Sequence, residues 1–312
     1  EFLVDERDGK GLGDDSSAKQ KKFYRIDLAG EGLDLAIRFG VESWPPLLMA
    51  GIRFVIAGGL MFGWLRWRGT PLPSRGEWAG AARIGFLLLV CGNGCVTIAE
   101  QWVASGVAAL GVATVPLFTL LFARMWGQHN TRLEWAGILL GFAGMVLLNL
   151  GHNMQASPLG AGLILFAAAA WALGSVWARY LQLPPGAMAP AAEMLCAGVM
   201  LLLLSVLTGE RLETPPTLQG WLALLYLVVF GSIIAFSAYM YLLKHVRPAA
   251  ATSYAYVNPA VAVLLGIVFA GEQIGFEECL AMAVIIGAVV LIGVPQWRKP
   301  SAASVPAVEV GK

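Results

Sequence analysis

The stretch SYAYVNPAVAVLLG, residues 253–266, places an Asn–Pro pair, Asn258 and Pro259, inside a long apolar run. A proline inside an ordinary helix costs about 3 kcal/mol, because it lacks a backbone N–H and its ring collides with the preceding turn. A second apolar run, GVATVPLFTLL at residues 111–121, contains Pro116. We expect both helices to be broken or bent where they line a cavity, since irregular backbone is tolerated there at membrane depth.

The composition around these two runs is that of a multi-pass membrane protein. Of the 312 residues, 58% are hydrophobic and 13% are charged, whereas a soluble domain carries roughly 25% charged residues. A helix needs about 20 residues to cross the hydrocarbon core of a bilayer. Nine apolar segments approach or exceed that length, and the short links between them leave no room for a soluble domain: 46–66, 80–102, 105–126, 134–151, 159–180, 188–208, 218–243, 249–271 and 277–296.

The charges of the connecting segments predict an orientation. Basic residues gather on one set of loops and chain ends, whereas the opposite set holds only Arg211. Because basic loops stay in the cytoplasm, we expect a protein of the bacterial inner membrane whose basic side, including the C-terminus, is cytoplasmic. The basic set consists of Arg66, Arg68, Arg75, Arg124, Arg132, Arg179, Lys244, Arg247, Arg298 and Lys299.

The two proline-containing runs belong to an internal repeat. When Pro116 is aligned with Pro259, the order of apolar segments matches in both halves of the chain. The segment RFVIAGG, which starts at residue 53, similarly overlies EMLCAGV, which starts at residue 193. Two halves of five helices follow, and the odd number inverts the second half, which is typical of secondary transporters. The predicted fold class is an all-α membrane protein with a ten-helix inverted 5+5 repeat.

The first of these ten helices cannot be recognised. It should lie at about residues 20–40, where each central charge would cost roughly 2.5–3.5 kcal/mol in a membrane. We therefore expect helix 1 to be corrupted and residues 1–34 to be an aberrant or disordered segment. Either these residues are translated out of frame or they form a genuine charged tail. The charges concerned are Arg25, Asp27, Glu31, Asp34 and Arg38.

Five stretches carry a family resemblance: FGVESWPPLLMAGIRF, CGNGCVTIAEQWVASGVAAL, ATVPLFTLLFARMWG, FGSIIAFSAYMYL and ATSYAYVNPAVAVLLG. Over about residues 35–295 the chain resembles the EamA family of the drug/metabolite transporter superfamily, and most of all its YedA-type members. The resemblance implies one EamA repeat at 35–151, a second at 159–296 and a cytoplasmic tail at 297–312. Members of the family begin helix 1 with Trp-Gly-Ser-Thr, and the residues found at 32–35, Gly-Leu-Asp-Leu, are what such codons give when they are read two bases later.

Polar side chains on the apolar segments are candidate substrate-binding residues. Asn93, Thr97 and Glu100 are spaced i, i+4 and i+7, so they share one helix face, and Trp171 and Ser175 share a face on another helix. A polar face at membrane depth turns toward the interior of the bundle. For Glu100 a solvated position at the helix end is the alternative, and for Trp171 it is helix packing.

The second half of the chain adds hydroxyl and aromatic side chains. Tyr239 lies on the eighth predicted helix, and Tyr254, Tyr256 and Asn258 lie on the ninth. A wall that accepts amphipathic organic solutes needs aromatic faces and a few hydrogen-bonding groups. We therefore expect these residues to bind substrate, with the two prolines as gating residues. The alternative is interhelical hydrogen bonding, which is worth roughly 0.6 kcal/mol for each bond.

Two charges, Arg53 and Glu193, lie inside apolar segments. At 1.5 Å per residue across a core of about 30 Å, they should be roughly 15 Å apart, so we expect each to snorkel or to have its own partner. Arg53 is deep enough for a functional charge role, which Glu100 could also have. A small-residue seam for helix packing or for a homodimer is formed by Gly137, Gly141 and Gly144.

These features favour one class of function. An intramembrane enzyme needs clustered acids, histidine ligands or an activated nucleophile, and the three histidines fall in or near loops on different sides. The four cysteines have no metal or redox spacing, and no basic run suggests nucleic acid. The hypothesis is a secondary transporter, without cofactor or metal, that moves small organic metabolites, amino acids or drugs by alternating access. The family resemblance implies the export direction, and a passive channel or membrane scaffold is the alternative.

Overall fold

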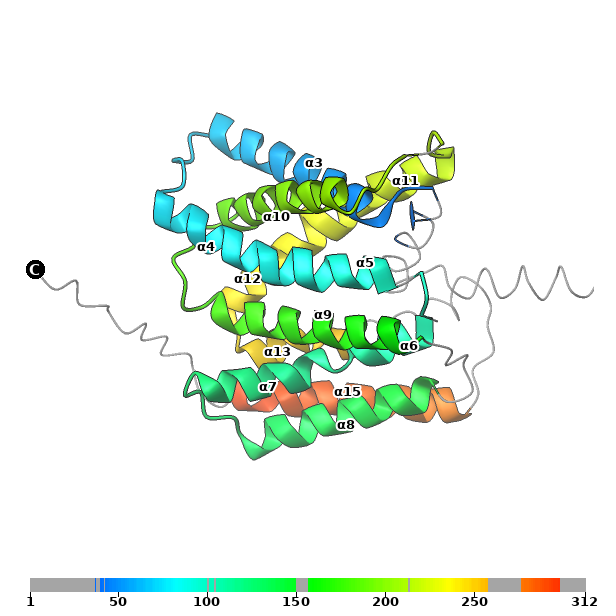
Figure 1. Cartoon of the computed structure of the whole chain (residues 1–312). Helices are drawn as coiled ribbons and strands as arrows, with labels where there is room; N and C mark the ends of the chain where they lie inside the picture. Colours follow the sequence, from blue (N-terminus) through cyan, green and yellow to red (C-terminus); the bar gives the residue numbers. More distant parts are fainter. Residues whose placement is uncertain are drawn as a thin grey trace, which may run out of the picture.

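A computed structural model describes residues 37, 40–41, 43–99, 101–103, 105–149, 157–212, 214–257 and 276–297. Every regular element in these ranges is a helix, and the helices lie side by side in a bundle (Figure 1). The predictions made for residues 1–34, Glu100, Asn258 and Pro259 lie outside the described residues.

The first half begins with α3 (Pro46–Trp67). A second, long helix follows, which consists of α4 (Arg75–Gly85), η1 (Phe86–Gly94) and α5 (Cys95–Ala99). The first half continues with α6 (Ser105–Val112), α7 (Val115–Met125) and α8 (Arg132–Asn149). The second half contains α9 (Pro158–Trp177), α10 (Met188–Leu207), the long helix α11 (Leu218–Tyr226), η2 (Leu227–Phe236) and α12 (Ser237–His245), then α13 (Pro248–Thr252) and α15 (Phe276–Trp297).

Six helices in the described residues are long and apolar enough to cross a membrane: Pro46–Trp67, Arg75–Ala99, Ala108–Met125, Pro158–Trp177, Met188–Leu207 and Leu218–His245. They coincide with six of the nine predicted segments. The other three predicted segments, 134–151, 249–271 and 277–296, lie partly outside the residues whose side chains are described. The prediction of a multi-pass helical membrane protein is therefore confirmed by the length and composition of the helices.

The helix that contains Pro116 is interrupted, as predicted. Helix α6 ends at Val112, the chain turns at residues 113–114, and Pro116 occupies the first turn of α7. A proline is accepted there because the N–H that it lacks would have no intrahelical partner at that position. In the second half, α13 ends at Thr252 and Ser253 forms a turn before the chain becomes helical again at residues 254–257.

The two long helices that contain π-helical segments occupy corresponding places in the two halves. The segment η1 follows α4, and η2 follows α11. A π-helical turn widens the helix and disrupts the regular i to i−4 hydrogen-bond ladder, and such turns occur frequently at functional sites.

The closest helix pairs are α3 with α10 and α8 with α15, which lie on opposite sides of α9 in Figure 1. A Cβ atom on Gly58 would lie 2.8 Å from the backbone nitrogen of Leu195, and one on Gly198 would lie 2.7 Å from the backbone nitrogen of Val55. In the repeat alignment Gly58 corresponds to Gly198, and Val55 corresponds to Leu195. The contacts are therefore reciprocal, as a local two-fold relation between the two helices requires.

The predicted glycine seam on α8 lies at contacts with other helices of the same chain. A Cβ atom on Gly137 would lie 2.9 Å from the carbonyl oxygen of Ala288, and one on Gly144 would lie 2.8 Å from the side chain of Ile285. Both contacts are made with α15. Of the two readings of this seam, the structure supports helix packing, and the homodimer stays a prediction.

A carboxylate from a neighbouring loop joins the ends of α3 and α10. The helix α3 begins after Pro45, which offers no side-chain cap. The Glu210 carboxylate instead accepts hydrogen bonds from the N–H groups of Leu47 at 3.1 Å and Leu48 at 2.9 Å, and from the Ser205 hydroxyl at 2.8 Å. A carboxylate at this position satisfies free N–H groups and interacts favourably with the helix dipole.

We predict that Gly58→Ala weakens the pairing of α3 with α10. The new methyl group would meet the backbone of α10, which cannot move without separating the helices, so the free energy of unfolding should fall by about 1–3 kcal/mol. The measurement is thermal unfolding of the purified protein in detergent.

The neighbouring Gly59 provides a matched control, because nothing lies within 4 Å of a Cβ atom placed there. Gly59→Ala should keep or slightly raise the stability, since alanine favours a helix by about 1 kcal/mol over glycine. Equal unfolding temperatures for the two variants would contradict the proposed backbone contact.

Candidate functional site

Four of the predicted substrate-binding residues form a buried cluster between α9, α12 and the helical residues 254–257. The Ser175 hydroxyl donates to the carbonyl oxygen of Trp171 at 2.6 Å, so its oxygen can accept the hydroxyl of Tyr239, which lies at 2.5 Å. The rings of Trp171 and Tyr239 lie 5.4 Å apart, and the Tyr254 ring meets Tyr239 edge-on at the same distance. These four residues are called the aromatic cluster below.

The predicted residues of the third helix lie beside this cluster. A Cβ atom on Gly92 would lie only 2.8 Å from the Trp171 ring, so the absence of a side chain at Gly92 lets η1 approach α9. Asn93 follows Gly92, and Thr97 donates its hydroxyl to the Asn93 carbonyl at 2.9 Å. Thr97 is buried and Asn93 is partly buried, and their neighbour Gly92 contacts the Trp171 ring of the cluster. That Asn93 and Thr97 bind substrate stays a prediction.

One buried polar atom in this region, Asn93 Oδ1, has no hydrogen-bond partner within the described part of the chain. It is an acceptor. A buried polar atom without a partner costs about 1–3 kcal/mol. A polar solute that supplied a donor would remove this cost, which makes Asn93 Oδ1 the most direct candidate for solute contact. The Trp171 Nε1 donor faces the Tyr239 hydroxyl instead.

Tyr256, which was predicted to bind substrate from the opposite side of the ninth helix to Tyr254, is separate from the aromatic cluster. Its hydroxyl donates to the carbonyl oxygen of Ile138 at 3.2 Å. A Cβ atom on Gly141 would lie 2.7 Å from its ring, so the ring packs directly against α8. These contacts give Tyr256 a packing role in the described structure.

Arg53 has a partner of its own, as one of the two readings of this residue expected. The side chain is only 5% exposed, and its Nε donates to the Ser232 hydroxyl of η2 at 2.7 Å. Its guanidinium also lies 4.7 Å from the centre of the Phe54 ring. Arg53 therefore connects α3 with η2 inside the bundle.

At one end of the bundle, polar contacts connect the loops to one another. Arg247 forms an ion pair with Glu134 at 3.1 Å and donates to the carbonyl oxygen of His129 at 2.8 Å. Arg179 donates to the carbonyl oxygen of Val246 at 3.0 Å. These contacts connect the turn before α8 and the end of α9 to the turn between α12 and α13. We call Glu134, Arg179 and Arg247 the latch, and the end that carries them the basic end.

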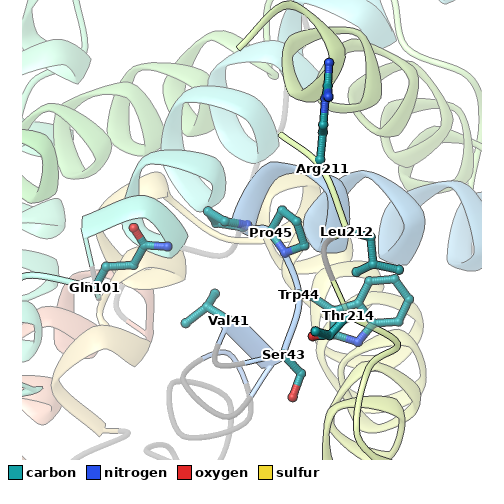
Figure 2. A pocket seen from close by; sticks show the side chains of 9 residues that line it. Val41, Ser43, Trp44, Pro45, Gln101, Arg211, Leu212 and Thr214 are labelled. Atoms are coloured by element: carbon teal, nitrogen blue, oxygen red, sulfur yellow. The ribbon is translucent and has the colours of Figure 1, made fainter. Parts of the chain in front are cut away.

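The opposite end contains a cavity of about 230 Å³ that the sequence analysis did not anticipate. Figure 2 shows it at the start of α3, with Gln101 on one side and the segment 211–214 on the other. Such a cavity arises where several loops meet, which helical spacing cannot reveal. Its lining residues are Val41, Ser43, Trp44, Pro45, Pro46, Gln101, Arg211, Leu212 and Thr214.

The aromatic cluster does not line this cavity, and its central residue, Tyr239, is only 6% exposed. The described structure thus combines a basic end whose loops are joined by polar contacts, a polar and aromatic cluster that is buried or partly buried, and a pocket at the opposite end. Within the described residues, no group of three or more His, Cys, Asp and Glu side chains is placed to hold a metal ion.

Comparisons with known proteins give the family and the fold. The EamA-like transporter family matches residues 33–150 and 158–294. The inner membrane transporter YedA of Escherichia coli (strain K12) is 54% identical over 266 residues, covering 85% of this chain and 87% of YedA. The transporter YdfC of Bacillus subtilis (strain 168) is 26% identical, covering 81% and 83%. A crystal structure at 23% identity has the same fold, with a TM-score of 0.71 over 92% of this chain and 99% of that chain.

We predict that Tyr239→Phe leaves the fold nearly as stable as before. The variant loses one interhelical hydrogen bond, worth roughly 0.6 kcal/mol, while Ser175 keeps its bond to the Trp171 carbonyl. Trp171→Ala should cost about 3–5 kcal/mol instead, because it leaves a cavity. Thermal unfolding in detergent measures both values. If Tyr239→Phe proved as destabilising as Trp171→Ala, the hydroxyl would have a structural role.

Proposed function

Because the chain belongs to the EamA-like transporter family, we propose that it is a secondary transporter that exports small organic solutes across the bacterial inner membrane by alternating access. The observation that carries this proposal is the buried aromatic cluster between a closed basic end and a cavity at the other end. An alternating-access transporter exposes a central site to one side at a time.

The proposed fold is a ten-helix inverted repeat with halves at 35–151 and 159–296. Its support is the reciprocal glycine contact between α3 and α10, the two π-helical segments at corresponding places, and the two separate family matches. In such a repeat the two halves move against each other around a site near the middle of the membrane.

The proposed solute site consists of the aromatic cluster together with Asn93 and Thr97. Tyr239 and Tyr254 offer aromatic faces, while Asn93 Oδ1 offers an acceptor without a partner in the described part of the chain. This combination suits an amphipathic organic solute with at least one polar group. Asn258 belongs to the same proposal, because it lies four residues after Tyr254.

The proposed gates lie at the two ends of the bundle. The latch closes the basic end, and the cavity near Trp44 is the outer vestibule. The interrupted helix at Pro116 would bend when one gate opens and the other closes. Pro259 would have the same role in the second half. A gate needs two arrangements that differ by only a few kcal/mol. In the latch, Arg247 is 33% exposed whereas Glu134 is only 1% exposed, so the gate opens when water or another donor replaces Arg247 at the Glu134 carboxylate.

The proposed orientation places the basic end in the cytoplasm, which the charge distribution favours. Cysteines introduced at Gln155 and Thr214 should react with a membrane-impermeant thiol reagent added outside intact cells, and a cysteine introduced at Ser74 should not. The unmodified chain, with its four native cysteines, gives the background signal. If Ser74→Cys reacted while the cysteines at positions 155 and 214 did not, the protein would have the opposite orientation to the one proposed.

Transport itself is tested with purified protein in proteoliposomes and a panel of amino acids and drugs. We expect accumulation of at least one solute against its concentration gradient, which a passive channel cannot produce. Tyr239→Phe should lower the transport rate although its stability is nearly unchanged. If no gradient-driven accumulation occurred for any solute, the channel or scaffold alternative would replace this proposal.

The latch has a matched pair of variants for the same assay. Arg247→Gln removes the ion pair with Glu134 and should slow export by at least about tenfold, because the buried Glu134 carboxylate loses its cationic partner and the closed basic end is destabilised. Arg132→Gln changes an exposed arginine at the same end and should leave the rate unchanged. Equal rates for both variants at equal abundance would exclude a gating role for Arg247.

A further inference from the structure

Glu193 is a buried acid that the proposed solute site does not use. It lies five residues after Met188, the first residue of α10, and therefore about 7.5 Å along the helix from the basic end. Its side chain is 0% exposed. Neither carboxyl oxygen has a hydrogen-bond partner within the described part of the chain.

Four elements pack against α10, the helix that carries Glu193: α3, α4, η1 and α12. The approach of α4 to the Glu193 backbone is especially close, since a Cβ atom on Gly85 would lie 2.5 Å from the carbonyl oxygen of Glu193. The fully buried side chain is thus held within a tightly packed part of the bundle.

The ionisable groups around Glu193 do not neutralise it through a hydrogen bond. Lys244 of α12 interacts with it electrostatically, but its Nζ donates to the carbonyl oxygen of Pro184 at 3.4 Å. Arg53 of α3 donates to Ser232, and Arg83 of α4 is exposed. The thiol of Cys196, on the same helix, also interacts electrostatically with Glu193. The other titratable groups on the elements that pack against α10 are Cys91 on η1 and Tyr239 on α12.

A proton is the ligand that this environment fits. A metal ion would need several oxygen, nitrogen or sulfur ligands, and no cluster of three or more suitable side chains exists in the described residues. A buried carboxylate without a partner costs several kcal/mol, whereas the neutral acid costs no more than other polar groups. Binding a proton therefore removes the free-energy cost of a buried negative charge, and no further protein group is needed for it.

We propose that Glu193 is a proton-binding site of the transport cycle, occupied while the basic end is closed and emptied when that end opens. On opening, the O–H bond breaks and the proton passes to water at the basic end, which leaves a carboxylate that the charge of Lys244 can stabilise. Because binding and conformation are linked reciprocally, a low pH on that side favours closure and a high pH favours opening. This inference rests on the proposed transport function.

The proton itself is tested without any solute. Infrared difference spectra of the purified protein against Glu193→Gln should contain the carbonyl stretch of a protonated carboxylic acid. Its intensity should fall as the pH rises, with the ratio of acid to carboxylate changing about tenfold per pH unit. Glu210→Gln is the matched control and should give no such band, since the Glu210 carboxylate accepts three hydrogen bonds. A spectrum without an acid band for Glu193, or a band that does not change with pH, would overturn the proposal.

The link to the cycle is tested by transport of a solute identified in the panel. The export rate of the unmodified protein should depend on the pH at the basic end, and Glu193→Gln should remove that dependence while the unfolding temperature stays unchanged. A pH dependence that persists in Glu193→Gln would refute the linkage. If no solute is transported by the unmodified protein, the proposed function fails, and the infrared result still decides whether Glu193 binds a proton.

Discussion

Close backbone contact between helices is the constraint on which the rest of the structure depends. Lipid is as apolar as leucine, so helices in a membrane associate through close packing rather than through the hydrophobic effect. Gly58 and Gly198 bring the backbones of α3 and α10 together, and Gly137 and Gly144 do so for α8 and α15. These two pairs enclose α9 and the π-helical segments, and thereby position the aromatic cluster.

Most buried serine and threonine hydroxyl groups in the described residues donate a hydrogen bond to a backbone carbonyl of their own helix. Thr97, Thr119, Ser175 and Thr252 each donate to a carbonyl oxygen four residues earlier in their own helix. Such bonds leave little demand for partners on other helices. Asn93 Oδ1 and the two carboxyl oxygens of Glu193 are among the buried polar atoms that remain without a partner in the described residues, and they lie in helices rather than at the loop ends of the bundle.

The two ends of the bundle differ in how they are held together. At the basic end, the latch connects three loops through charged side chains. At the other end, the Glu210 carboxylate fixes α10 to the start of α3, and a cavity lies beside this junction. The Glu210 carboxylate has three donors that the helix ends hold in place, whereas the latch depends on the side chain of Arg247, which is 33% exposed and within reach of water. This contrast makes the basic end the more natural place for a gate that opens and closes.

Several features were determined by the sequence alone: the helical membrane class, the family, the interruption at Pro116 and the inward-facing stripe of Asn93 and Thr97. They depend on hydropathy, backbone chemistry and helical spacing, which are local properties. Only the tertiary structure decided that Tyr256 packs against α8 while Tyr254 joins Tyr239, that Arg53 finds Ser232, and that loops form a cavity near Trp44. These results depend on which helices lie side by side, and spacing along one helix carries no information about its neighbours.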